Sequence, residues 1–88
     1  MVEEFNKEFQ IGKEGEKRVF HFKRIVYAAT LLKYAITSRF GNPVNMVQDK
    51  NNKWVFEYKL IIVPIELQTL EADFAKVIEE NENQAASN

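Results

Sequence analysis

His21 is the only histidine in this chain of 88 residues, and the chain contains no cysteine. A single imidazole can exchange a proton or bind a metal, but a histidine pair or a catalytic triad needs partners that one chain cannot supply here. A metal site would depend on Asp or Glu ligands, and the lack of thiols excludes zinc–thiolate sites, thiol catalysis and disulfides. We interpret His21 as a structural or surface residue and predict no metal and no cofactor.

Carboxylates are numerous, since the chain has 13 Asp and Glu residues. A general acid needs an apolar pocket that raises the pKa of its carboxyl group, and most of these residues lie in polar stretches. Glu57 has aromatic neighbours, but alternation along a strand turns it outward. No nucleotide-binding or calcium-loop pattern occurs, and Gly12 to Gly15 lacks the Lys-Ser/Thr of a phosphate-binding loop. The sequence therefore predicts a protein that is not an enzyme.

The first half of the chain is basic. Residues 13–39 contain seven Lys and Arg residues and two Glu residues, a balance of plus five. Proteins that bind single-stranded nucleic acids combine cations, which contact phosphates, with rings that stack on bases. Nucleic-acid binding is therefore an alternative function, although such rings more often belong to a core strand with solvated flanks. The predicted contacts are Lys17, Arg18, Phe20, Phe22, Lys23 and Arg24.

The C-terminal part of the chain is acidic. Residues 66–82 contain six acidic residues and one Lys, a balance of minus five. A row of carboxylates can imitate DNA phosphates and inhibit a DNA-binding protein, whereas a charged outer helix face more often only keeps the helix in water. A DNA-mimicking inhibitor is thus a further alternative. Its acidic face would consist of Glu66, Glu71, Asp73, Glu79 and Glu80.

Tyr27, Thr30 and Tyr34 form the predicted partner-binding row, because their spacing places them on one face of a predicted helix. Tyrosine tolerates exposure and contributes strongly once it is buried in an interface, although such rings can also lie against a neighbouring sheet. The leading prediction is therefore a small non-enzymatic protein that binds another protein. It would act as a regulator, adaptor or inhibitor.

The elements that carry these residues follow from hydrophobic periodicity. Apolar and polar residues alternate over residues 5–11, a glycine-containing turn covers 12–16, and 17–22 is again rich in strand-forming residues. From Arg24 to Phe40 the apolar residues follow helical spacing, and Gly41 to Pro43 can end the helix. One long helix from Glu16 to Phe40 stays open as an alternative.

The second half repeats this order. Residues 44–48 and 53–63 predict a hairpin around the turn 49–52, with Trp54 and Phe56 on its core face. Pro64 ends the second strand, and Leu67, Leu70 and Phe74 begin the apolar stripe of a second amphipathic helix. The predicted fold class is α+β, in the order ββαββα, with two antiparallel hairpins packed against two helices.

Length and composition predict one compact domain over residues 1–80 and a disordered polar tail over 81–88. Small domains have modest stability, and apolar Ile61 and Val63 lie on the outer strand face, so we predict a homodimer. The N-terminus lacks the pattern of a secretory signal, and no apolar stretch approaches the roughly 20 residues of a membrane span. These features predict a cytoplasmic protein that does not bind membranes. The frequent Lys and Asn suggest an AT-rich genome, such as that of a phage.

Overall fold

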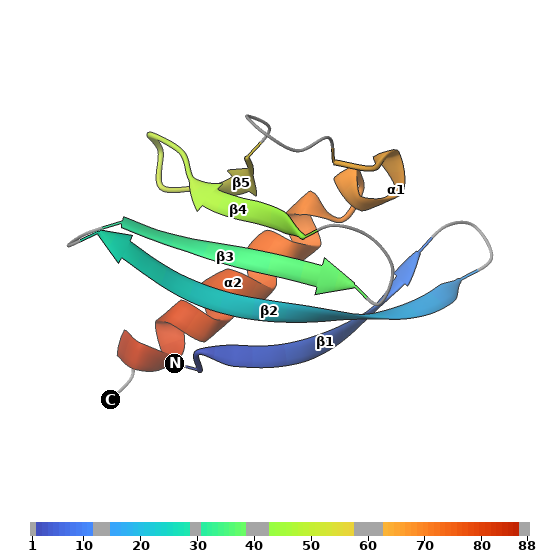
Figure 1. Ribbon diagram of the computed structural model, residues 1–88, viewed down its shortest axis with the longest axis horizontal. Helices are drawn as coiled ribbons and strands as arrows, with labels where there is room; N and C mark the ends of the chain where they lie inside the picture. The colour runs from blue at the N-terminus through green and yellow to red at the C-terminus, as the bar shows by residue number, and fades with distance from the viewer. Residues whose placement is uncertain (1, 12–14, 29–30, 39–42, 58–62, 87–88) are drawn as a thin grey trace.

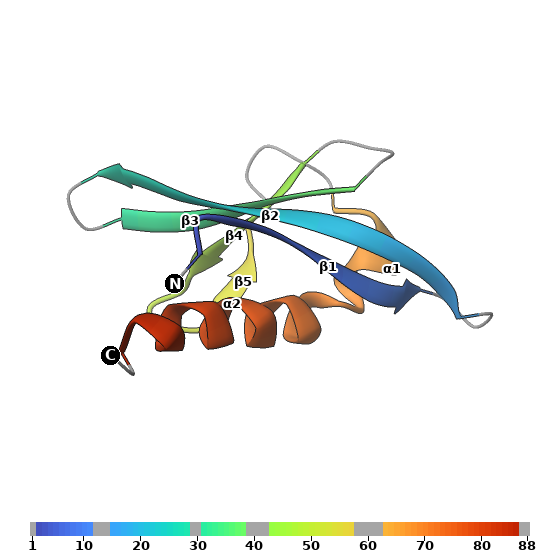
Figure 2. The same cartoon turned by 90° about the horizontal axis from the view of Figure 1, so that it is seen from below.

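Five strands form one antiparallel sheet in chain order, and a C-terminal helix lies across one face of it (Figures 1 and 2). The computed structural model describes residues 2–11, 15–28, 31–38, 43–57 and 63–86. The strands are β1 (Glu4–Ile11), β2 (Glu16–Ala28), β3 (Leu31–Ser38), β4 (Val44–Gln48) and β5 (Trp54–Phe56). The helices are α1 (Ile65–Gln68) and α2 (Glu71–Ala86). The α+β class is confirmed, but the order ββαββα is wrong.

Alternation along the strands decides which side chains face α2. Phe20 and Phe22 of β2 are buried. Val19, His21 and Lys23, which alternate with them along the strand, are more exposed. The register places Phe22 between Phe5 of β1 and Ile36 of β3, so the same face continues across the sheet. Residues two apart share a face of a strand, so each strand contributes one apolar row to the interface with α2.

The predicted helix from Arg24 to Phe40 is wrong, and so is the alternative of one long helix from Glu16. β2 continues to Ala28, and β3 then returns antiparallel to it. The segment is rich in β-branched and aromatic residues, which suit a pleated sheet, and Tyr34 and Ile36 alternate inward along β3. The prediction failed because the apolar residues of these two successive strands happen to have the spacing expected for a single helix. The first half therefore contributes three strands instead of two strands and a helix.

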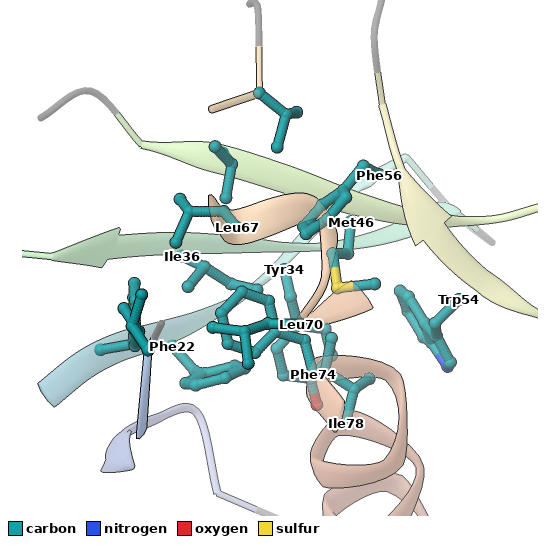
Figure 3. Packing of buried hydrophobic residues seen from close by; sticks show 14 residues of the cluster. Phe22, Tyr34, Ile36, Met46, Trp54, Phe56, Leu67, Leu70, Phe74 and Ile78 are labelled. Atoms are coloured by element: carbon teal, nitrogen blue, oxygen red, sulfur yellow. The ribbon is translucent and has the colours of Figure 1, made fainter. Parts of the chain in front are cut away.

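Phe74 of α2 is the centre of the hydrophobic core (Figure 3). Its side chain is fully buried, and its ring lies edge-on to Phe9, Phe20, Phe22 and Phe56, with centroid separations of 4.9 to 6.0 Å. Edge-to-face packing at this separation adds to the free energy gained by burying the rings. The phenylalanines of the strands thus hold the sheet and α2 together.

The second hairpin is confirmed where the structure describes it. β4 pairs with β5, and Trp54 and Phe56 face the core as predicted. The Asp49 carboxylate accepts hydrogen bonds from the backbone N–H groups of Asn51 (2.8 Å) and Lys53 (3.0 Å), which fixes the turn. Ile61 lies outside the described residues. Val63 is only 2% exposed, so it belongs to the core and not to an outer apolar edge.

The predicted second helix corresponds to α1 and α2, with the stripe residues Leu67, Leu70 and Phe74 buried. α2 continues to Ala86, through residues predicted to lie in a disordered tail, and Asn81 in this part is buried. Residues 87 and 88 lie outside the described residues. Within the part of the chain that the structure describes, neither helix has the length and apolarity needed to cross a membrane.

Candidate functional site

The end of the β2–β3 hairpin extends beyond both neighbouring strands (Figure 1). Pairing with β1 reaches Lys23, one further backbone bond joins Arg24 N–H to the Glu3 carbonyl (2.8 Å), and pairing with β4 stops at Lys33. The residues beyond these points pair only with each other among the described strands. We call residues 25–28 and 31–32 the hairpin tip.

The hairpin tip exposes large apolar side chains. Val26, Tyr27 and Leu31 are 57%, 52% and 50% exposed, and they are three of the six large apolar residues that the described ranges expose. The Lys33 ammonium lies 5.4 Å from the centroid of the Tyr27 ring, a cation–π geometry that orients this ring. The pairing of β2 with β3 shifts register between Val26 and Ala28, so Tyr27 lies at an irregularity of the strand.

The structure separates the predicted partner-binding row. Tyr27 is on the hairpin tip, Thr30 lies outside the described residues, and Tyr34 is fully buried. The ring of Tyr34 lies edge-on to Trp54, with centroids 5.3 Å apart. The three residues are therefore not one exposed helical row, and Tyr34 cannot contact a partner while the protein keeps this fold.

Tyr34 instead belongs to a polar network that joins α2 to the sheet and to the N-terminus. The Glu82 carboxylate accepts hydrogen bonds from the Tyr34 hydroxyl and from Arg24, through Nε (2.8 Å) and Nη2 (3.2 Å). The Asn81 side chain donates to the Tyr34 hydroxyl (2.8 Å) and exchanges two hydrogen bonds with the backbone of Val2 (2.9 and 3.0 Å). We call these residues the Glu82 network.

Two pKa shifts follow from the Glu82 network. Burial alone would raise the pKa of Glu82, but the hydrogen bonds from Arg24 and Tyr34 outweigh it, and the pKa lies below its ordinary value of 4.5. Burial and the bond to Glu82 raise the pKa of Tyr34 well above its ordinary value of 10.0. Glu82 is therefore ionised, and Tyr34 is neutral, over the whole range between these ordinary values.

We expect the free energy of unfolding to fall at both ends of the pH scale. The pKa of Glu82 is depressed in the folded state, so its contribution is present above pH 4.5 and is lost as the pH falls through the folded pKa. The pKa of Tyr34 is raised, so its contribution is present below pH 10.0 and is lost as the pH rises toward the folded pKa. Urea unfolding as a function of pH measures both effects.

Two variants assign these pH effects to the network. Glu82→Gln should reduce the acid-side loss, and Tyr34→Phe should reduce the alkaline-side loss. The difference from the wild type is the relevant quantity, because hydrogen bonds from the Lys53 and Asn51 backbone also lower the pKa of Asp49. Parallel pH profiles for the wild type and both variants would show that the network does not cause the pH dependence.

The predicted nucleic-acid contacts do not share one surface. Phe20 and Phe22 are buried against α2, as in the core-strand interpretation, so their rings cannot stack on bases. Arg24 faces Glu82, and Arg18 is half-buried on the same side of β2. Lys23 is exposed on the opposite face. Lys17 is also exposed there, with its Nζ 4.0 Å from the Glu8 carboxylate on β1.

The predicted acidic face is also divided. Glu71 is half-buried, and its carboxylate accepts a hydrogen bond from the Phe56 backbone N–H (2.8 Å), which joins the start of α2 to β5. The other four residues, Glu66, Asp73, Glu79 and Glu80, are exposed. His21 hydrogen-bonds Asn6 (2.8 Å) and Glu4 (3.1 Å) on β1. No group of three potential metal ligands occurs among the described residues.

A shallow pocket of about 340 Å³ lies on the α2 side of the sheet, beside the hairpin tip. Leu32 of the tip forms one wall. The other walls come from the β4–β5 hairpin and from the C-terminal half of α2, which are remote in sequence. For this reason no local pattern could predict the pocket. Its polar lining residues are Gln48, Asn52, Trp54, Glu79, Glu82 and Asn83.

Comparisons with known proteins found no match for this chain. No protein-family model matches the chain, and searches of curated proteins and of solved structures found no match either. The hairpin tip and the pocket beside it are therefore the two candidate sites, and both rest on the geometry of this chain alone.

Proposed function

We propose that this protein is a non-enzymatic binding module that contacts another protein through the hairpin tip. The supporting observation is the cluster of Val26, Tyr27 and Leu31, each about half exposed, at the end of a hairpin that extends past its neighbours. Aromatic residues and large apolar residues at the centre of an interface contribute most of the binding free energy. A regulator, adaptor or inhibitor would use such a surface.

The backbone of the hairpin tip supports the same proposal. An isolated two-stranded hairpin is marginally stable in water, and the outer edges of residues 25–28 and 31–32 have no neighbouring strand among the described residues. Such edges can pair with a strand of a partner, while pockets on the partner cover the side chains. Binding would therefore satisfy the backbone of the tip and bury its apolar side chains together.

Site-specific photo-crosslinking in extracts of the source organism can identify the partner. A photoreactive amino acid replaces Tyr27 in one variant and Ile65, which is 78% exposed on α1, in the control. We expect a protein that crosslinks at position 27 and not at position 65. A partner captured equally at both positions would contradict the assignment of the tip.

Affinity for the purified partner then tests the side chains. We expect Tyr27→Ser and Leu31→Ser each to weaken binding at least about tenfold, because a central interface residue contributes about 1.4 kcal/mol or more. Ile65→Ser removes a similarly exposed apolar side chain elsewhere and should change the affinity less than about twofold. Circular dichroism confirms that each variant is folded. Equal losses in all three variants would reject the tip as the contact surface.

Two further measurements separate the alternatives. A second copy of the chain could occupy the tip, and sedimentation as a 10.3 kDa species at high micromolar concentration would exclude this homodimer. Oligonucleotides should not bind at low salt, because the rings of Phe20 and Phe22 are buried and Lys17 and Lys23 are the only exposed residues among the six predicted contacts. We also propose a cytoplasmic location, since a chain without cysteine suits a reducing compartment.

A further inference from the structure

The pocket beside the hairpin tip is rich in hydrogen-bond acceptors. Glu79 and Glu82 contribute carboxylates, and three amide side chains contribute oxygens that can accept. The nitrogen of Gln48 donates to the Asn52 backbone carbonyl (3.3 Å), which leaves the Gln48 oxygen available as an acceptor. The two carboxylates can only accept hydrogen bonds, so the pocket suits a ligand group that carries several N–H donors.

The charge of the pocket depends mainly on Glu79. Arg24 already compensates Glu82 through two hydrogen bonds. Glu79 is exposed and has no ion-pair or hydrogen-bond partner within the described ranges. The pocket therefore keeps about one uncompensated negative charge at its rim, which favours a cation.

Trp54 contributes a hydrogen-bond donor to the pocket. Its side chain is largely buried, since the residue is only 5% exposed, and it lines the pocket. Figure 3 shows the indole nitrogen at the end of the ring that points away from the core. This N–H has no hydrogen-bond partner among the residues that the structure describes, and it still reaches solvent, since no fully buried polar side-chain atom of these residues lacks a partner. The N–H is therefore available to an acceptor on a ligand.

The rim of the pocket is fixed before any ligand binds. The Asp49 turn holds Asn52 at a φ of 64°, a left-handed conformation that asparagine tolerates. On the opposite side, the Glu82 network anchors the C-terminal half of α2 to β2 and β3. Binding to a preformed site costs less conformational entropy than binding that orders its own residues.

We propose that this pocket binds the guanidinium group of an arginine in a peptide segment, with the indole N–H of Trp54 donating to a carbonyl of the same segment. A guanidinium carries five N–H donors in a planar fork and no acceptor, which matches the carboxylates and amide oxygens. It cannot satisfy the indole N–H, whereas a peptide carbonyl can. The site shares Leu32 with the hairpin tip, but it does not use the exposed side chains of Val26, Tyr27 or Leu31.

The indole N–H resonance of Trp54 is a direct probe, because the chain has one Trp. We expect N-acetyl-arginine N-methylamide to shift this resonance in a 15N–1H spectrum, with saturation in the millimolar range typical of a single side chain, about 1–20 mM. The isosteric citrulline derivative is uncharged and should shift it at least about fivefold less. Methylguanidinium tests the carbonyl contact, since it offers the cation alone and should bind more weakly.

Glu79→Gln and Glu80→Gln form a matched pair, since both positions are exposed on α2 and both changes remove one charge. Glu79 lines the pocket and Glu80 does not, so we expect about fivefold weaker binding of the arginine derivative in the first variant and no change in the second. Equal losses in the two variants, or equal shifts with arginine and citrulline, would overturn the guanidinium assignment. An indole resonance that does not move up to about 20 mM would overturn the site itself.

Discussion

Phe74→Ala is expected to lower the free energy of unfolding by about 3–5 kcal/mol, more than any other single substitution proposed for this protein. The Phe74 side chain is fully buried and contacts rings from β1, β2 and β5, so its removal leaves a cavity that no single element can fill. Domains of this size are only marginally stable, so such a loss is a large share of the total. Urea unfolding followed by circular dichroism measures it.

Phe5→Ala is the matched control for Phe74→Ala, because it removes the same ring from the edge of the sheet. Phe5 is half-buried and stacks on Phe22, with centroids 5.0 Å apart. We expect a loss of about 1–2 kcal/mol. If Phe5→Ala destabilises the protein as much as Phe74→Ala does, α2 does not pack on the sheet through Phe74 as described.

Glu82→Ala is expected to have the second-largest effect, a loss of about 2 kcal/mol in the free energy of unfolding. The substitution leaves the guanidinium of Arg24, whose side chain is 14% exposed, and the buried hydroxyl of Tyr34 without their shared acceptor. This loss of stability is smaller than the loss expected on breaking a fully buried ion pair, because 24% of the Glu82 side chain is still exposed to water. Chemical denaturation at pH 7 measures the loss.

Glu80→Ala removes a carboxylate two residues away on the exposed surface of α2, and it should change the stability by less than about 0.5 kcal/mol. In a double-mutant cycle, Arg24→Met and Glu82→Ala together should cost less than the sum of the single changes, because each change alone already removes the Arg24–Glu82 pair. Additive losses, or equal effects of Glu80→Ala and Glu82→Ala, would show that the Glu82 network does not anchor α2.

Local periodicity predicted the parts of the fold in which one strand or helix forms one apolar face. The strand at residues 5–11, the inward Trp54 and Phe56, and the stripe of Leu67, Leu70 and Phe74 are confirmed for this reason. The helix predicted over residues 24–40 was wrong, because the apolar positions of two adjacent strands happen to have helical spacing. The β-branched and aromatic content of this segment was the signal that favoured strands.

The candidate sites could be predicted only in small part. Tyr27 was identified because its residue type suits an interface, but its partners on the hairpin tip, Val26 and Leu31, were not. Their exposure depends on where pairing with β1 and β4 stops. Tyr34 and Glu82 are 48 residues apart, and the pocket joins the β4–β5 hairpin to the end of α2, so no spacing in the sequence reveals either arrangement.

Amide hydrogen exchange, measured with and without the crosslinked partner, tests whether the hairpin tip is the contact surface. In the free protein, amides of residues 25–28 and 31–32 should exchange much faster than those of Phe20, Phe22 and Ile36, which lie in the middle of the sheet. Bound partner should slow exchange at the tip and leave the outer surface of α2 unchanged. Slower exchange on α2 alone, with the tip unaffected, would contradict the proposed binding surface.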